Sequence, residues 1–475
     1  MAENWDVVVI GAGAIGLMTA QALADRDPRL RIAVFTGPGS GGASASSGAM
    51  IAPFTELTAA GLREPDHAER LQYARRAAAL WRDHLARFDD GDLITSDGVV
   101  LIANTVSTDL ADHNYRAIKS ALRAETADFE QLDPAELGRG VSPAWHARPT
   151  EAILVHEEYA FDARAAFALM TGNWTSRCNI RLVQACAKLR HESPSSAPDV
   201  IDDTGQVHSA GAVVVAAGAW TRDLFPDDDR RLLPPVFSGV GMALLVAQPA
   251  VPIPLAVRTP NESFACGLHA VPQRDGLLYL GETSQLAVHP ALHAPLGAIE
   301  HLARSSVRQL STRLAETRHL GTLTGNRPVS LDLDPVIGRT ALANVHVATG
   351  TGREGLALSP VIGEYLAGQV LAGHGNDIKL WDPQRPPQQA WTAEAAAAEV
   401  VRNTMCSFAE KEGKFAFAGW YEQAPRVLAA HAEQVYENLP AGFVIEPALC
   451  DLYLRDPESM TPILDEYLQA WGWHR

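Results

Sequence analysis

A short apolar strand runs directly into three glycines near the start of the chain, where residues 5–16 read WDVVVIGAGAIG. Gly11 permits the tight turn out of the strand, Gly13 lets the backbone approach a pyrophosphate, and Gly16 lets the next helix pack close. The phosphates of a dinucleotide would then bind free N–H groups at the helix N-terminus. Because strand, glycines and an apolar-periodic segment occur in this order, the sequence predicts a Rossmann-like dinucleotide-binding unit.

The composition is that of a large folded protein with an acidic balance. The 475 residues carry a net charge of -17, and 47% of them are hydrophobic. This length has room for about two to four domains, and the hydrophobic content excludes extensive disorder. The acidic balance argues against nucleic-acid and membrane partners, because both attract basic surfaces. A strand that begins at about Trp5 leaves no room for a signal peptide, so we expect a cytoplasmic protein.

The cysteines predict neither disulfides nor a metal site. They are five, an odd number, and none forms a CxxC pair or has histidines at zinc spacing. We therefore expect reduced thiols and no bound metal. The cysteines are Cys178, Cys186, Cys266, Cys406 and Cys450.

Alternating helix and strand signals follow the first glycines. Spaced apolar residues predict a helix from residue 14 to about 27. The second predicted strand, residues 31–36, ends at Thr36, where most dinucleotide folds have an acidic residue that binds a ribose hydroxyl. Further along, the patterns predict a helix over residues 71–88, strands over 97–103, 180–190 and 212–217, and a helix from Thr221.

Two segments rich in small residues lie far apart in the chain. Residues 38–53 read PGSGGASASSGAMIAP, and such small side chains let backbone N–H groups crowd a cofactor. Residues 345–350 predict a strand that runs into Gly350, Gly352 and Gly355 and then a helix. This second glycine turn supplies another cluster of N–H donors. One cofactor with two distant electron-rich ends would use both turns.

The remaining segments predict a substrate-binding sheet and a helical tail. Residues 235–285 have a β-like pattern broken by Pro, Gly and Asn turns, which favours an antiparallel sheet, and a helix is expected over 298–316. After about residue 376 we expect a Pro/Gln linker over 381–391 and helices over 392–411, 415–436 and 459–471. The tail would cover the mouth of a pocket, form an oligomer contact or dock a partner, and the sequence leaves these three uses open.

The order of these motifs resembles the flavoprotein family of glycine oxidase, D-amino-acid oxidase and sarcosine oxidase over residues 5 to about 373. The motifs are VVVIGAGAIG, ASSGAMIAP, VVVAAGAW, GNRP followed by DPVIG, and ATGTGREGLALSP. Among the members of this family, the chain is most similar to glycine oxidase. The resemblance implies an α/β fold with a discontinuous Rossmann-like FAD-binding domain, a substrate domain with an antiparallel or mixed sheet, and an α-helical appendage. Their expected ranges are 1–90, 150–225 and 325–375 for the first, 91–149 and 226–324 for the second, and 376–475 for the third.

The resemblance also implies which residues contact FAD. Residues 320–340 contain no cysteine for the covalent attachment found in sarcosine oxidases, so noncovalent FAD is implied. The expected contacts with pyrophosphate and ribose are Gly11, Gly13, Ala14, Ile15, Gly16, Thr36, Ala43 and Ser44. The expected neighbours of the isoalloxazine are Gly48, Ala49 and Met50, with Gly352, Arg353, Glu354, Gly355 and Leu356 at its pyrimidine end. Lys188 is expected at the adenine. Ala217 and Gly218 are the remaining expected FAD contacts.

The same resemblance implies catalytic roles for Arg327, His269, Arg353 and Met50. Arg327, in GNRP, matches the arginine that binds the substrate carboxylate in glycine oxidase, and a guanidinium makes two parallel charge-assisted bonds to such a group. His269 stands where glycine oxidase has a tyrosine that lines the pocket, and a structural histidine is the alternative. Arg353 would border the substrate unless Glu354 neutralises it. The missing acidic residue at Thr36, the replacement by His269 and the added tail favour a reaction other than simple glycine oxidation.

The implied reaction oxidises the CH–NH bond of a small amino acid or secondary amine to an imine, by hydride transfer to flavin N5 with O2 as electron acceptor. One alternative is an FAD-dependent amine dehydrogenase that uses another acceptor. A nicotinamide-dependent dehydrogenase is a second alternative. It needs an acidic residue or an arginine after the second strand to recognise the ribose, and it leaves the later glycine turn unexplained. A non-catalytic flavin-fold protein whose tail binds a partner is a third. The tail is also compatible with a homo-oligomer.

Overall fold

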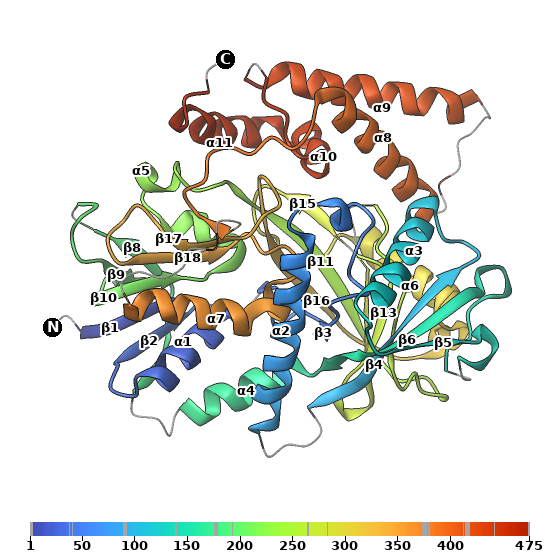
Figure 1. Ribbon diagram of the computed structural model, residues 1–475, viewed down its shortest axis with the longest axis horizontal. Coiled ribbons are helices and arrows are strands. Elements are labelled where there is room, and N and C mark those ends of the chain that lie inside the picture. Colours follow the sequence, from blue (N-terminus) through green and yellow to red (C-terminus); the bar gives the residue numbers. More distant parts are fainter. Residues whose placement is uncertain are drawn as a thin grey trace.

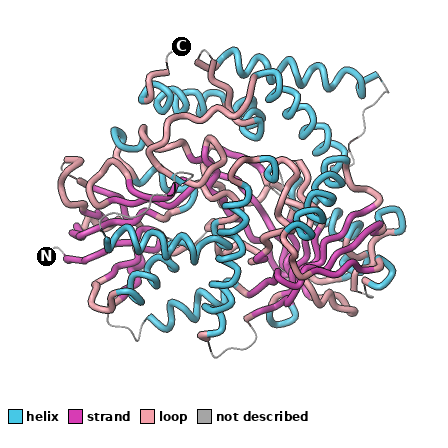
Figure 2. The backbone as a smooth tube through the Cα atoms, in the orientation of Figure 1, coloured by secondary structure: helices cyan, strands magenta, loops and turns pink. Residues whose placement is uncertain are grey.

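The protein consists of two β-sheets surrounded by helices, with the C-terminal helices as a separate layer along one side (Figure 1). The computed structural model describes residues 3–473 apart from 38, 40, 89–92, 138–139, 175–178, 192, 264–265, 283, 373–377, 379–380, 412, 414–418 and 441. Strands gather in two groups within this frame, and helices lie outside both of them (Figure 2).

The first sheet is parallel at its centre. Strand β1 (Glu3–Ile10) lies between β2 (Ile32–Thr36) and β10 (Val207–Val215), and both neighbours run parallel to it. In the described part of the chain the sheet has eight strands in the order β17-β18-β10-β1-β2-β7, extended by β9 beside β10 and β8 beside β9. The other bounds are β7 (Ile180–Gln184), β8 (Ala187–Arg190), β9 (Asp199–Asp202), β17 (Val336–Arg339) and β18 (Val345–Thr349).

Both faces of this sheet are buried, which explains the continuous apolar run of β1. Val7 and Val9 join one buried cluster, and Val8 and Ile10 join another, because successive side chains of a strand point to opposite faces. The first cluster includes residues of α1 (Ala14–Arg26), α2 (His67–Ala86), α4 (Ala163–Trp174) and α7 (Gly355–Ala372). Helices α1 and α7 follow parallel strands, so both begin at the carboxyl edge of the sheet, where ligands bind in such folds.

The second sheet is mostly antiparallel, and β4 and β12 form a parallel pair within it. In the described residues it has ten strands in the order β15-β11-β14-β13-β12-β4-β6-β3, with β16 beside β11 and β5 beside β6. Helices α3 (Asp109–Ala124) and α6 (Leu296–Gln309) share buried clusters with its strands. The bounds are β3 (Met50–Ile51), β4 (Ile94–Asn104), β5 (Phe129–Leu132), β6 (Pro149–Phe161), β11 (Val236–Ala247), β12 (Ala256–Arg258), β13 (His269–Pro272), β14 (Leu277–Gly281), β15 (Gln285–Ala287) and β16 (His319–Ser330).

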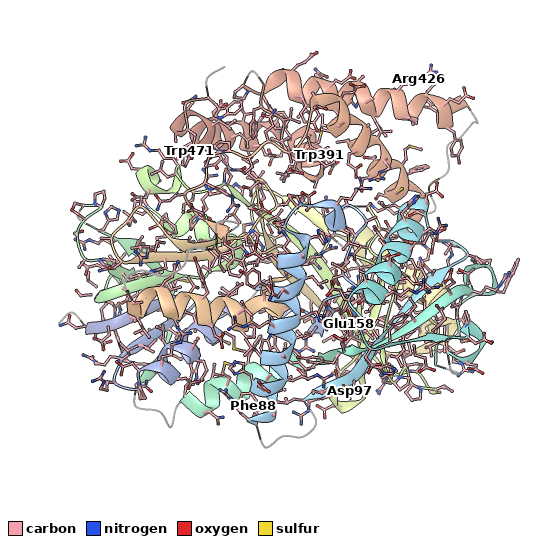
Figure 3. The ribbon with its side chains drawn as sticks, in the orientation of Figure 1. Phe88, Asp97, Glu158, Trp391, Arg426 and Trp471 are labelled. Atoms are coloured by element: carbon pink, nitrogen blue, oxygen red, sulfur yellow. The ribbon has the colours of Figure 1, made fainter. Side chains whose placement is uncertain are left out.

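The C-terminal helices have their own core and are attached to the body. Their bounds are α8 (Ala393–Glu410), α9 (Gly419–Asn438), α10 (Pro447–Arg455) and α11 (Pro457–Ala470). Their buried cluster also takes in Phe237, Val288 and Leu331 from the body. Trp391 lies where this layer meets the body, whereas Arg426 lies at its outer side (Figure 3). The tail is therefore packed onto the protein.

The expected fold class is confirmed, and several local expectations are corrected. Residues 180–190 form two strands instead of one, because β7 pairs with β2 whereas β8 pairs with β9. The helix expected from Thr221 is a short 3₁₀ helix over Gly218–Leu224. Helix α10 was not expected, and the segment taken for a linker contains Trp381 and Arg385, both buried.

The expected domain boundaries differ from the sheets at three places. Strands β3, β6 and β16 belong to the second sheet, although residues 50–51, 150–161 and 325–330 were expected in the cofactor domain. The division into domains otherwise stays a prediction.

Helix α7 is long and apolar enough to cross a membrane by length and composition alone. More than half of it, 56%, is buried inside the protein. Its packing against the first sheet, α1 and α2 accounts for this composition, as for a core helix.

The described cysteines are free thiols, as expected. Cys186 is exposed, Cys406 is half-buried, and Cys266 and Cys450 are buried. Cys178 lies outside the described residues.

Candidate active site

The turn after β1 leaves no space for side chains at two of its glycines. Gly11 has a φ of 115°, and a Cβ there would lie 2.3 Å from the carbonyl oxygen of Ala216. A Cβ at Gly16 would lie 1.9 Å from the carbonyl oxygen of Gly11. The tight turn and the close approach of the helix are therefore present. Ala217 lies beside this turn, and Gly218 follows Ala217 in the sequence.

The N-terminus of α1 is suited to an anion. The Ala14 N–H donates to Ser44 Oγ at 3.0 Å, and the cap residue Gly13 makes no side-chain hydrogen bond. No acidic residue lies in the first turn, so nothing in the helix itself neutralises the positive end of its dipole. Ser44 joins the second glycine-rich segment to this helix end, where the predicted pyrophosphate would bind.

Buried hydrogen bonds hold that glycine-rich segment against the second sheet. Asn326 of β16 is 1% exposed, and both its backbone N–H and its side-chain amide donate to the Gly41 carbonyl at 2.9 Å. Ser46 Oγ donates to the carbonyl of Thr324 at 2.9 Å, and the Tyr279 hydroxyl donates to the carbonyl of Ser46 at 3.1 Å. Residues 41–46 of the loop between β2 and β3 are thus fixed at the junction of the two sheets.

Residues expected beside an isoalloxazine ring lie over Tyr279. A Cβ at Gly48 would lie 2.9 Å from the Tyr279 ring. Ala49 has a φ of 51°, and Met50 packs against the buried cluster that contains Tyr279. Ala43 lies on the same loop, with its Cα 3.3 Å from the position of a Cβ at Gly325.

The later glycine turn lies beside the first. A Cβ at Gly355 would lie 3.8 Å from Cδ1 of Ile15, at the start of α1. Gly350 and Gly352 have φ values of 70° and 53°. The Gly352 N–H donates to the carbonyl of Pro328 at 2.7 Å, which ties the turn to the strand that carries Arg327.

These features fit a dinucleotide cofactor with an extended ring system. The helix N-terminus and the turn at Gly11 suit its diphosphate, and the second turn begins α7 next to the same helix. The segment from Gly48 to Met50 leads into β3 at the edge of the second sheet. The structure therefore brings together the two turns that the sequence separates by more than three hundred residues.

One face of the second sheet carries Arg327, Tyr279 and His269. The strand register pairs Gly239 with Arg327, Ala243 with Gly281, and Gly281 with His269. Directly paired residues share a face, as do residues two apart in one strand, so the three side chains lie on the same side. A Cβ at Gly241 would lie 2.6 Å from the guanidinium nitrogens of Arg327, and this glycine therefore makes room for the arginine.

Tyr279 was missed by the sequence analysis. Its ring stacks on that of His269, with centroids 5.7 Å apart. The alternation in GLLYLGE places Tyr279 and Gly281 on one face, and this was the available signal. The sequence did not show that His269 pairs with that strand.

His269 is buried and neutral at pH 7. Burial and the positive charges of Arg258 and Arg327 lower the pKa of the imidazole to about 4, against opposing effects of Gly267 and Glu56. Its Nδ1 lies 2.9 Å from the carbonyl of Gly267. A carbonyl only accepts, so Nδ1 carries the hydrogen and Nε2 has a free lone pair.

Glu56 and Arg258 form an ion pair that the sequence analysis did not identify. Arg258 is fully buried and donates through Nη1 to Glu56 Oε1 and through Nη2 to Asn261 Oδ1, the latter at 2.6 Å. Glu56 Oε2 also lies 4.0 Å from Arg353. Burial opposes ionisation of Glu56, but the charges of both arginines lower the pKa of its carboxyl to about 2. Residues 56 and 258 are too distant in sequence for a local pattern to link them.

The loop that carries Glu56 is anchored by Glu158 of β6. This carboxyl accepts from the N–H of Phe54 at 2.6 Å, the N–H of Thr55 at 2.8 Å and the hydroxyl of Thr55 at 2.6 Å. Glu158 is fully buried, which raises its pKa to about 7 in spite of these donors. It is labelled on the second sheet in Figure 3.

The remaining expected residues have simpler surroundings. Thr36 ends β2, and its hydroxyl reaches the carbonyl of Gly37 at 3.4 Å. Lys188 lies on β8 opposite Ile201, with its side chain exposed. Leu356 is buried in α7, and Glu354 is exposed just before that helix. The cofactor contacts of all these residues stay predictions.

Comparisons with known proteins agree with this arrangement. The family model described as FAD dependent oxidoreductase matches residues 6–369. A bifunctional protein ThiO/ThiG from Synechocystis sp. is 27% identical over 391 residues, which are 81% of this chain and 54% of that protein. The chain thus spans about half the length of this relative. A glycine oxidase from Geobacillus kaustophilus is 25% identical over 382 residues, which are 78% of this chain and 94% of that protein.

Solved structures share the fold. A glycine oxidase structure from Geobacillus kaustophilus superposes with a TM-score of 0.67 at 22% identity and covers 82% of this chain and all of that one. An iminodiacetate oxidase from Chelativorans sp. BNC1 superposes with a TM-score of 0.65 at 21% identity and covers 79% of this chain and 98% of that one. The glycine turns, the open helix N-terminus and the family match together mean that the chain belongs to the family of FAD-dependent oxidoreductases.

Proposed function

We propose that this protein oxidises the carbon–nitrogen bond of a small amino acid or secondary amine that carries a carboxylate. The observation that carries the proposal is the position of Arg327. It lies on one sheet face with Tyr279 and His269, and the Gly352 turn is hydrogen-bonded to the adjacent Pro328. The names of two relatives, glycine oxidase and iminodiacetate oxidase, indicate small amino-acid substrates of the same chemical class.

Arg327 would bind the substrate carboxylate. Its guanidinium makes two parallel charge-assisted bonds to such a group, which fixes both position and orientation. Arg353 is less suited to this task, because Glu56 lies 4.0 Å from it and offers a competing carboxylate. Glu56 also holds Arg258, so the negative charge of this loop keeps both arginines occupied.

His269 would receive the substrate amine. Because its Nδ1 donates to Gly267, its Nε2 can accept a hydrogen bond from a substrate N–H. A neutral imidazole places no positive charge next to the amine. Together with Arg327, it would hold the C–H bond of the substrate in one orientation, and such positioning accounts for much of the rate of enzymatic reactions.

FAD, when bound, supplies the chemistry by accepting a hydride from the carbon next to nitrogen. Gly11, Gly13, Gly16 and Ser44 would hold its diphosphate, and the segment 48–50 with Gly352 and Gly355 would hold its ring. We propose noncovalent binding and O2 as the electron acceptor. A quinone-type acceptor is the alternative, and comparing reoxidation by O2 and by a soluble quinone distinguishes the two.

The test is flavin reduction without oxygen by glycine, sarcosine and other small amino acids. Arg327→Ala should weaken substrate binding by about 2 to 4 kcal/mol, the loss of two hydrogen bonds to a charged group, which is roughly a 30- to 1,000-fold lower kcat/KM. Arg318→Ala is the matched control, because Arg318 is exposed just before the same strand. Equal substrate affinity and reduction rate in wild type and Arg327→Ala would remove Arg327 from the substrate site.

A further inference from the structure

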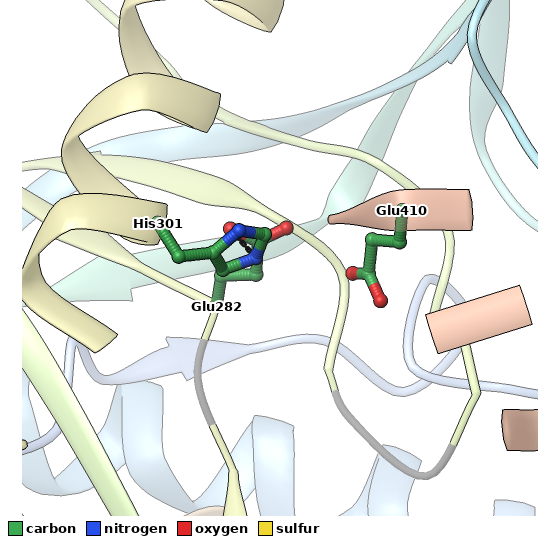
Figure 4. A group of neighbouring side chains, drawn as sticks. All are labelled: Glu282, His301 and Glu410. Carbon is green, nitrogen blue, oxygen red and sulfur yellow. Dashed lines mark ion pairs between the residues drawn. The ribbon is translucent and has the colours of Figure 1, made fainter. Parts of the chain in front are cut away.

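A group of one buried and two half-buried side chains joins the tail to the second sheet, outside the predicted substrate site. Glu282 directly follows β14, His301 lies on α6, and Glu410 is the last residue of α8. Their ligand atoms all lie within 4.8 Å of one another. Figure 4 shows His301 next to Glu282, with the Glu410 carboxylate approaching them from the tail.

The separation between His301 and Glu282 suits coordination better than hydrogen bonding. His301 Nε2 lies 3.4 Å from Glu282 Oε2, which is long for a hydrogen bond. Tetrahedral zinc has ligands at about 2.0–2.1 Å, which separates neighbouring ligand atoms by about 3.3 Å. The imidazole nitrogen and the carboxylate oxygen therefore have the separation of two ligands on one ion.

A second observation is that the group contains an unsatisfied buried atom. The Glu282 side chain is 3% exposed, and its Oε2 has no hydrogen-bond partner among the described residues. The Cys266 thiol donates to the Glu282 backbone carbonyl and not to this oxygen. A buried carboxylate oxygen without a donor is costly unless a cation or a proton compensates it.

A third carboxyl lies in this region. Glu262 is 6% exposed and accepts from the Thr108 hydroxyl at 3.2 Å. Arg304 and Lys411 lie near His301, but Arg304 already pairs with Glu300 at 3.3 Å.

We propose that Glu282, His301 and Glu410 bind one divalent transition-metal ion of the zinc type, which fastens the C-terminal helices to the substrate-binding sheet. Imidazole together with carboxylates is a ligand set for zinc and its neighbours, whereas magnesium and calcium prefer oxygen ligands only. Three protein ligands leave a fourth position for water. Sequence spacing gives no sign of such a site, because the three residues come from distant segments.

The site has a structural consequence for the substrate face. Glu282 is adjacent in sequence to Gly281, where a Cβ would lie 2.5 Å from Nε2 of His269. An ion at Glu282 would therefore link the end of α8 to the strand that packs against this histidine. It would act as a positioning element and has no part in the proposed chemistry.

Zinc binding to the full-length, FAD-loaded protein tests this inference. The protein, without an affinity tag, is treated with a chelator and then titrated with Zn²⁺ by calorimetry. We expect one tight site per chain, a slower cleavage of the tail by protease when zinc is present, and much weaker binding of Mg²⁺. Glu410→Gln should lower zinc affinity by at least about tenfold, since loss of even a supporting group outside the ligand set costs that much.

Glu399→Gln is the matched control, because it removes the same charge from the same helix. Neither substitution changes a cysteine, so all thiols are retained in both variants. It should bind zinc like the wild type, and His301→Asn should behave like Glu410→Gln in case one variant folds poorly. Absence of a saturable zinc site, or equal affinity in the Glu410→Gln and Glu399→Gln variants, overturns the proposal. The carboxyls would then be compensated by protons. Flavin reduction by amines is measured separately, so a failure of this proposal leaves the proposed oxidation unaffected.

Discussion

At the scale of single residues, glycines without space for a side chain decide where the cofactor can bind. Gly16→Ala places a methyl group 1.9 Å from the Gly11 carbonyl, which forces α1 away from the turn. Overpacking of this kind costs about 1 to 3 kcal/mol or more, so FAD affinity should fall at least about fivefold in a fluorescence titration of the apoprotein. Gly172→Ala in α4 is the control, because a Cβ there meets nothing within 4 Å, and it should leave FAD affinity unchanged.

The burial of His269 predicts a specific loss of stability in acid. Its pKa falls from 6.5 to about 4 on folding, so between these values the unfolded chain binds the proton and the folded chain does not. The free energy of unfolding therefore decreases as the pH falls through this range, by about 2 kcal/mol between pH 7 and pH 5. The measurement is urea unfolding at both pH values for wild type and His269→Gln. If His269→Gln loses as much stability between pH 7 and pH 5 as the wild type does, His269 titrates normally in the folded protein.

Which site residues were predictable at this scale depended on local motifs. Gly11, Gly16, Ser44 and Gly355 belong to contiguous segments whose backbone requirements show in the sequence. Tyr279 escaped because its importance depends on strand register, and Glu56 because its partner Arg258 lies 202 positions away. Long-range pairing of this kind is absent from local periodicity and propensity.

At the scale of elements, the segment between the body and α8 is held by one buried arginine. Arg385 is 7% exposed and donates to both carboxylate oxygens of Asp332, at 2.6 and 2.7 Å. Nη1 and Nη2 also donate to the carbonyls of Pro335 and Asp334. The segment read as a linker from its proline and glutamine content is therefore an anchored connection.

Removal of this side chain should be strongly destabilising. Arg385→Ala leaves Asp332 buried without its partner, which costs about 3 to 5 kcal/mol. Arg402→Ala is the comparison, because Arg402 pairs with Glu399 while about half exposed, and such surface pairs contribute about 0 to 1 kcal/mol. Urea unfolding followed by tryptophan fluorescence measures both. Equal stability of the two variants would argue that Asp332 is compensated in another way.

Elements were predictable from sequence to different degrees. Long amphipathic helices such as α2 and α8, and the buried strand β1, follow from periodicity and apolar runs. Helix α10 spans only nine residues, too few for a periodic signal, and the break between β7 and β8 depends on which strands they pair with. The assignment of β6 to the second sheet likewise follows from its pairing with β4 and β5.

At the scale of the whole molecule, the tail completes the hydrophobic core of the body. Phe237, Val288 and Leu331 are each less than 10% exposed because the helices from α8 to α11 cover them. Further contacts join the layers, among them the ion pair of Arg222 with Glu466 at 2.7 Å. A use of the tail as a freely attached docking module does not agree with this packing.

A chain that ends at residue 380 should therefore associate or precipitate. Truncation exposes these three apolar side chains together, and contiguous apolar patches promote association. Size-exclusion chromatography of the truncated and full-length proteins at equal concentration is the measurement. A truncated protein that elutes as a stable monomer with unchanged flavin content would mean that the tail is dispensable for the fold.

The two hydrogen bonds from Asn326 to the carbonyl of Gly41 have a consequence for assembly of the holoenzyme. They involve only protein atoms, so they align the cofactor loop with the strand that carries Arg327 independently of bound FAD. Flavin uptake should then require little ordering of this loop against the strand that carries Arg327.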